Sequence, residues 1–192
     1  MSAFVFKNRG AILSLGALLL VVFGHPAFNG IFWAGIAIAV LGELVRVWAV
    51  GYSGVTTRAD HVTAPFLVTA GPYAYVRNPL YVGNFITAVG FAMAFVSGMA
   101  ALPATVLVVI TLGLMVATYA IIIPYEEAYL ASTFGEPFAV YVRTVPRVIP
   151  RPPKSPGQGT YRPDVIWRAE TRTFVTFVVV LLVLFLRLSV WR

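Results

Sequence analysis

The chain has 192 residues, of which 59% are hydrophobic and 11% charged, with a formal net charge of +7 and no cysteine. Its mean hydropathy of +0.86 excludes an ordinary soluble domain and indicates an integral membrane protein. The missing cysteines exclude disulfides, thiolate nucleophiles and cysteine-based metal sites. His25 and His61 alone would make a poor site, so we expect no bound metal.

Five apolar runs are long enough to cross a bilayer as helices, because a span needs about 20 residues. In chain order they cover residues 10–28, 31–52, 80–101, 102–125 and 173–191. The first four predict two helical hairpins, over 10–52 and 80–125. The fold class predicted is therefore all-α: a polytopic integral membrane protein with about five transmembrane helices in a single membrane domain.

Most basic residues border the apolar runs on one side of the predicted membrane. Eleven flank the N-terminus and the two long polar segments: Lys7, Arg9, Arg58, Arg77, Arg143, Arg147, Arg151, Lys154, Arg162, Arg168 and Arg172. The short connections near Asn29 and Ser97 carry none. The positive-inside rule therefore predicts a protein of the inner (cytoplasmic) membrane, with its N-terminus and long segments cytoplasmic. The charges suit anionic lipid headgroups, and no basic, aromatic-interleaved surface predicts a nucleic-acid partner.

Segment 53–79 is polar and rich in turn signals, which predicts an ordered, re-entrant segment and not a linker. Gly71-Pro72 predicts a turn, and Asn78-Pro79 predicts an extended residue before a helix that accepts proline in its first turn. Tyr73 and Tyr81 could stack on an adenine or attract a sulfonium cation, although an interfacial aromatic belt would also explain them. We interpret this segment as a cytoplasmic cofactor segment.

Charged residues inside the apolar runs are further candidates. Glu43 and Arg46 share one helix face, either as a neutralising pair that docks helices or as groups that face a polar substrate. Glu126 and Glu127 are adjacent, so on a helix they point about 100° apart and cannot share one ligand. A carboxylate there could accept two hydrogen bonds from a ribose diol. The alternative is a pair of solvated acids at a helix end.

Segment 126–163 is expected to close the candidate site. The helix that carries the Glu pair should continue through Thr133 and end at Gly135. Residues 134–145 have apolar side chains at helical spacing, which predicts an amphipathic helix on the membrane interface. A proline-rich, extended connection then leads to the last helix.

Two linked motifs resemble the isoprenylcysteine carboxyl methyltransferase family, with its prokaryotic membrane relatives and, more distantly, the phospholipid methyltransferases. The first is PFLVTAGPYAYVRNPLYVG at 65–83, and the second is EEAYLASTFGEPFAVYVRTVP at 126–146. The upstream stretch LGELVRVWAVG at 41–51 is similar to the helix that precedes the first motif in such enzymes.

The resemblance implies an S-adenosylmethionine-dependent methyltransferase that acts on a lipophilic or small amphiphilic acceptor arriving from the bilayer. Its cofactor would be closed from the cytosol by the carboxy-terminal segment. Carried over position by position, the implied cofactor contacts are Pro65, Phe66, Leu67, Val68, Tyr73, Asn78, Pro79, Leu80, Tyr81 and Glu126. We add Gly71, because glycine permits a close approach of the backbone.

Two departures from the family pattern bear on the chemistry. Asn78 stands where the family has a histidine, so this position cannot titrate. Ile122 replaces the arginine that relatives place one turn before the Glu pair, which argues against methylation of a prenylcysteine carboxylate. A carboxylate or neutral amine acceptor would need no base, whereas a thiol or phenol would need one. The candidates for that catalytic role are Glu127 and the Glu43/Arg46 pair.

Two other functions remain open at this stage. An NADPH-dependent membrane reductase of the sterol-reductase type has a similar carboxy-terminal region, but its dinucleotide would require a longer pocket and a basic phosphate site. A transporter subunit or scaffold would leave the polar segment and the Glu pair without a task, and no inverted repeat supports it.

Overall fold

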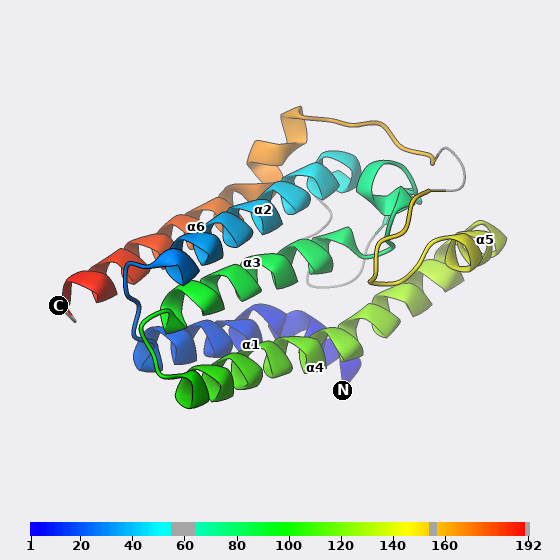
Figure 1. Ribbon diagram of the computed structural model, residues 1–192. Coiled ribbons are helices and arrows are strands. Elements are labelled where there is room, and N and C mark those ends of the chain that lie inside the picture. Colours follow the sequence, from blue (N-terminus) through cyan, green and yellow to red (C-terminus); the bar gives the residue numbers. More distant parts are fainter. Residues whose placement is uncertain (55–63, 154–156, 191–192) are drawn as a thin grey trace.

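The fold is a bundle of long helices in a computed structural model that describes residues 1–54, 64–153 and 157–190. Five helices in these residues are long and apolar enough to cross a membrane: α1 (Ser2–Phe23), α2 (Gly30–Ser53), α3 (Pro79–Val96), α4 (Ala101–Phe134) and α6 (Asp164–Val190). A short 3-10 helix, η2 (Gly71–Ala74), precedes α3, and α5 (Glu136–Thr144) follows α4. Figure 1 shows the bundle, and no strand occurs among the described residues. The predicted all-α class is confirmed.

The closest packing in the bundle joins α2 to α3 through glycines on both helices. A Cβ atom at Gly35 would lie 2.6 Å from the carbonyl oxygen of Gly90, and one at Gly42 would lie 2.7 Å from that of Gly83. Small residues allow helix backbones to approach in this way, and such approaches stabilise helix pairs in membranes. The α2–α3 contact fixes the end of α2 relative to the start of α3.

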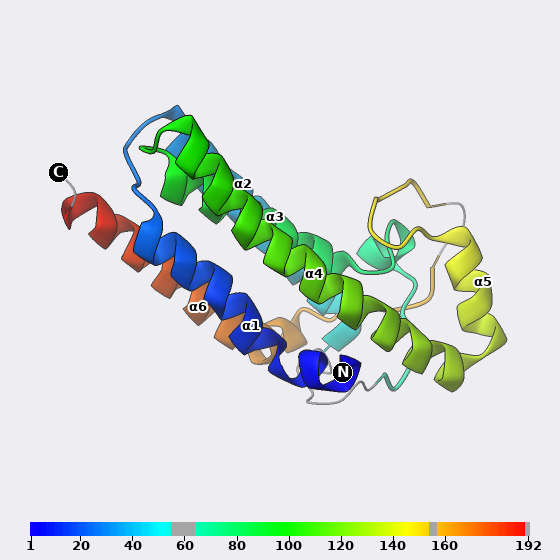
Figure 2. The ribbon, with the colours of Figure 1, turned by 90° about the horizontal axis from the view of Figure 1, so that it is seen from below.

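The loops after α1 and α3 are joined at the end of the bundle that also holds the last turns of α6. Gly98 N–H donates to the carbonyl of His25 at 2.9 Å, and Asn29 Nδ2 donates to the carbonyl of Ser97 at 2.7 Å. Asn29 Oδ1 also accepts from Phe32 N–H at 3.0 Å and so caps α2. We call this the loop end. Figure 2 shows it opposite the N-terminus and α5, which lie at what we call the motif end.

Four helices have boundaries that differ from the sequence expectation. α1 begins at Ser2 and ends at Phe23 instead of covering 10–28, because Arg9 is helical and stacks 4.0 Å above the Phe6 ring. α6 begins at Asp164 instead of 173, since its charged first turns bury Val165 and Ala169. α3 ends at Val96 and α4 begins at Ala101.

The helix α4 continues through Pro124 and ends at Gly135, as the sequence predicts. Its 34 residues correspond to about 51 Å at about 1.5 Å per residue, more than the roughly 30 Å of a bilayer's hydrocarbon core. Gly135 has a φ of 56°, which favours glycine, and it redirects the chain into α5. The Phe138 and Tyr141 side chains of α5 are buried, in agreement with the amphipathic helix expected here.

Candidate active site

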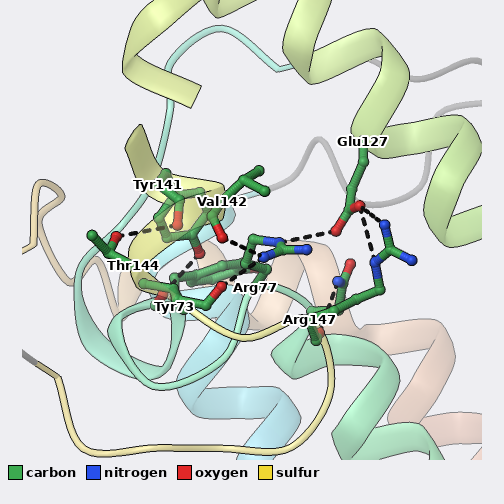
Figure 3. A network of polar contacts seen from close by, with 9 residues as sticks. Tyr73, Arg77, Glu127, Tyr141, Val142, Thr144 and Arg147 are labelled. Atoms are coloured by element: carbon green, nitrogen blue, oxygen red, sulfur yellow. Dashed lines mark hydrogen bonds and ion pairs between the residues drawn. The ribbon is translucent and has the colours of Figure 1, made fainter. Parts of the chain in front are cut away.

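Glu127 and two arginines join α4 to the polar segments at the motif end (Figure 3). Arg77 Nε contacts Glu127 Oε1 at 3.0 Å, and Arg147 donates to Oε2 from Nε at 3.0 Å and from Nη2 at 2.6 Å. Arg77 Nη1 also donates to the carbonyls of Val142 and Val145, at 3.0 and 2.6 Å. Both oxygens of Glu127 are therefore engaged in charge-assisted hydrogen bonds.

Further hydrogen bonds join segment 126–163, which is expected to close the site, to the first motif. Arg77 N–H donates to the carbonyl of Pro146 at 2.8 Å, and Arg151 N–H donates to that of Tyr75 at 3.0 Å. Asn78 Nδ2 donates to the carbonyl of Arg147 at 3.0 Å. Residues 145–151 thus lie on residues 75–78, which brings the two sequence motifs together at one end of the bundle.

Tyr73 and Tyr81 of the first motif lie near Glu126. The Tyr81 hydroxyl is within hydrogen-bonding reach of the Glu126 carboxylate. Burial, with a contribution from the negative charge of Glu126, raises the pKa of Tyr73 to about 12, although a hydrogen bond with Ser53 acts in the opposite direction. Tyr73 is therefore neutral at physiological pH and can donate a hydrogen bond. The adjacent glutamates have separate partners, as their helical geometry requires.

Gly71 makes its close approach to an aromatic ring of the protein itself. It has a φ of 59°, and a Cβ atom there would lie 2.6 Å from Cζ of Tyr52 on α2. The Tyr52 ring in turn packs 5.4 Å from the ring of Tyr161, which leads into α6. The absence of a side chain at Gly71 therefore allows segment 71–74 to pack against α2.

The first residues of the first motif lie at the surface of the described chain. Pro65 and Phe66 are exposed, and Leu67 and Val68 are half-buried. The chain leading to α6 covers the residues that follow, because Gln158 accepts from Thr69 N–H at 2.9 Å and its own N–H donates to Thr69 Oγ1 at 2.7 Å. His61 and Arg58 lie outside the described residues.

Pro79 and Leu80 start α3, as the Asn78-Pro79 signal predicts, and Pro79 is fully buried. Of the eleven cofactor candidates, the structure thus brings Tyr73, Tyr81 and Glu126 into one group. The cofactor role of each of the eleven, and the catalytic roles of Glu127 and Arg46, stay predictions.

Arg46 belongs to a buried polar cluster that extends deeper into the bundle. Its Nη2 atom donates to both carboxylate oxygens of Glu170 on α6, at 2.9 and 2.8 Å, and its Nε lies 3.9 Å from Glu43. It also hydrogen-bonds Asn84 on α3. The sequence analysis does not identify Glu170, which is fully buried, because the apolar run that predicts the last helix begins only at 173. It does not identify Asn84 either, although one amide in an apolar helix is a usable signal.

Two cavities adjoin these groups. The inner cavity, of about 430 Å³, lies among α1, α2, α3, α4 and α6, and its polar lining includes Glu43, Arg46, Asn84, Thr87, Thr111, Tyr119, Arg172 and Thr173. The outer groove, of about 540 Å³, lies between α3, α4 and residues 147–150, with Asn78, Tyr81 and Arg147 among its lining residues. Tyr119 lines both, and its ring lies 4.6 Å from that of Tyr81. Tyr119 therefore borders both cavities and lies next to Tyr81, the partner of Glu126.

An all-helical membrane bundle with a polar group next to largely apolar cavities is an arrangement suited to chemistry on lipophilic molecules. The phospholipid methyltransferase family model matches residues 31–137, more than half of the chain. The chain therefore belongs to this family of membrane methyltransferases, and the resemblance to isoprenylcysteine carboxyl methyltransferases is confirmed.

Three curated relatives illustrate the similarity. The cobalt-zinc-cadmium resistance protein CzcN of Cupriavidus metallidurans is 30% identical over 82% of this chain and 66% of its own length. The protein-S-isoprenylcysteine O-methyltransferase of Schizosaccharomyces pombe is 34% identical, over 57% of this chain and 45% of its own. Protein-S-isoprenylcysteine O-methyltransferase B of Arabidopsis thaliana is 31% identical, over 60% and 57%. The chain thus spans 45% to 66% of the length of these relatives. No solved structure matches it.

Proposed function

We propose that this protein transfers a methyl group from S-adenosylmethionine to a lipophilic or small amphiphilic acceptor within the membrane. The observation that carries the proposal is the grouping of Tyr73, Tyr81 and Glu126, beside two apolar cavities and inside the region shared with membrane methyltransferases. The reductase alternative finds no support in the family match.

The residues present fit an adenosyl cofactor. The Glu126 carboxylate offers two acceptor oxygens for a ribose diol, and the half-buried rings of Tyr73 and Tyr81 offer aromatic faces for a purine or a sulfonium. S-adenosylmethionine would supply a methyl group on a positively charged sulfur. The protein would contribute position and exclusion of water, which are the main sources of acceleration for a displacement of this kind.

Glu127 and Asn78 fit positioning roles in this scheme. Both Glu127 oxygens bind arginines, so its carboxylate holds the second motif on the first instead of standing ready for a proton. Asn78 holds the carbonyl of Arg147 through its amide nitrogen. Ile122, at the position of the family arginine, is fully buried and apolar, and so provides no charge for a substrate carboxylate. We therefore propose an acceptor other than a prenylcysteine carboxylate.

Thermal unfolding of the detergent-purified protein tests the cofactor assignment. S-adenosylhomocysteine should raise the Tm and NADPH should not, because only a ligand that binds the folded state stabilises it. The Glu126→Gln protein should bind S-adenosylhomocysteine roughly tenfold to a hundredfold more weakly, as expected for loss of a charge-assisted hydrogen bond. Glu136→Gln is the matched control, since Glu136 is 71% exposed on α5. Stabilisation by NADPH and not by S-adenosylhomocysteine would contradict the proposal and would indicate a reductase.

We also propose that the motif end faces the cytoplasm, on the basis of its basic residues. Among the described residues, Lys7, Arg9, Arg77, Arg143 and Arg147 lie at that end. The natural absence of cysteine allows single-cysteine labelling. In intact cells, a membrane-impermeant maleimide should label Ala100→Cys, at the loop end, and should label Thr160→Cys only after permeabilisation. The reverse pattern would invert the topology.

A further inference from the structure

The inner cavity combines a long apolar wall with a short polar region. Leu20, Phe91, Phe95, Phe177 and Val180 contribute to the wall toward the loop end. The volume of about 430 Å³ lies in the lower part of the range of small-molecule sites, about 300 to 1,000 Å³. It suits one hydrocarbon chain and is small for a two-chain phospholipid.

Two hydroxyl groups that line this cavity are buried and have unused hydrogen-bonding capacity. Thr111 Oγ1 and Tyr119 Oη make no hydrogen bond of normal geometry to any residue that the structure describes, and each residue is only 7% exposed. The Asn84 side chain lies within hydrogen-bonding reach of the Tyr119 hydroxyl, so Thr111 is the group with the greater need of a partner. A buried polar group without a partner costs about 1–3 kcal/mol, so a ligand with a hydrogen-bonding head would relieve a cost already present in the fold.

The charged groups around the polar region compensate one another. Arg46 is held bidentately by Glu170 and lies 3.9 Å from Glu43, while Arg172 is exposed at the cavity margin. Two carboxylates and two guanidinium groups give no net formal charge. To reach the deep part of the polar region, an anionic head would have to displace Glu170 from Arg46, because Arg172 lies only at the exposed margin. The deep part therefore favours an uncharged head group.

The cavity opens sideways, between α1 and α6. Its lining residues Ala17 on α1 and Thr176 on α6 are exposed, and they belong to the spanning parts of their helices. An opening at this depth faces hydrocarbon and not water. The α6 wall lies outside residues 31–137, which the family model matches.

We propose that the inner cavity binds a single-chain amphiphile with an uncharged hydroxyl or carbonyl head, which hydrogen-bonds Thr111 and Tyr119 and enters between α1 and α6. Its chain lies along the apolar wall toward Leu20 and Val180. The proposal concerns binding alone, and it holds whether or not the protein transfers a methyl group.

Photolabelling of the full-length protein in lipid nanodiscs tests this site. The probe is a ten-carbon primary alcohol with a diazirine at its tail, and crosslinks should map to peptides that contain Leu20 or Val180. Unlabelled 1-decanol should compete at concentrations about tenfold or more below decanoate, because Arg46, the cation deepest in the cavity, is already held by Glu170. Ala88→Phe, which places a ring in the cavity, should abolish the crosslinks, whereas Ala117→Phe, at an exposed position on α4, should not.

A matched pair of threonines keeps the test decisive even where Ala88→Phe fails to fold. Thr111→Val should weaken competition by 1-decanol roughly fivefold, as expected for one hydrogen bond, and leave competition by decane unchanged. Thr118→Val should have no effect, because Thr118 is equally buried but already donates to the Leu114 carbonyl at 2.7 Å. Equal competition by decane and 1-decanol, or equal behaviour of the two valine variants, would show a crevice that any lipid fills and would overturn the proposal.

Discussion

Replacing Gly90 by alanine is expected to destabilise the protein strongly, although alanine is the better helix former. The added Cβ atom would lie 2.5 Å from the carbonyl oxygen of Gly35 and 2.7 Å from Cα of Ala39, and both are backbone atoms of α2 that no side-chain rotation can move. Overpacking of this kind costs about 1–3 kcal/mol and occasionally more, and here two spanning helices must separate. We expect a loss of about 2 kcal/mol or more in the free energy of unfolding, measured by denaturant titration in micelles.

Gly113→Ala is the control for this prediction, because a Cβ atom at Gly113 on α4 meets nothing within 4 Å. The same substitution should be neutral there or stabilising by roughly 0.5–1 kcal/mol, the ordinary preference for alanine over glycine in a helix. Opposite signs at the two positions are the expected result. Equal effects would mean that α2 and α3 are not packed through their glycines.

The second large effect is expected from Arg46→Met, which keeps the length of the side chain but removes its charge. Glu170 is fully buried and Glu43 is 8% exposed, and both would lose the guanidinium that compensates them. Breaking a buried ion pair from one side typically costs about 3–5 kcal/mol. The free energy of unfolding of this variant should fall by about that amount in the same titration.

Arg143→Met provides the comparison, since Arg143 pairs with Glu136 on α5 where both side chains are about 70% exposed. Exposed pairs contribute about 1 kcal/mol or less. Adding Glu170→Leu to Arg46→Met should recover part of the loss, because an apolar pair often replaces a buried ion pair without cost. If Arg46→Met and Arg143→Met proved equally mild, the buried cluster would have no structural role.

Local patterns in the sequence predicted much of the bundle. The apolar runs gave the helix hairpins, Asn78-Pro79 marked the start of α3, and Gly135 marked the end of α4. Each of these signals acts through neighbouring residues, by backbone geometry or by the need to bury an apolar run. Such signals can be interpreted without knowledge of the tertiary structure.

Pairings between distant residues could not be predicted in this way. Glu170 became part of the buried cluster only because α6 begins nine residues earlier than its apolar run, and its partner Arg46 is 124 residues away. The sequence offers Glu127 as a candidate base, but it could not predict the contacts of Glu127 with Arg77 and Arg147. Gly71 signalled a close approach, but the sequence could not identify Tyr52 as the group approached.

The most direct measurement is an experimentally determined structure of the protein with S-adenosylhomocysteine. We expect ligand density at the motif end, in contact with both Glu126 and the Tyr73–Tyr81 segment. Density for the ligand at the loop end, or at the motif end but away from Glu126, would contradict the account.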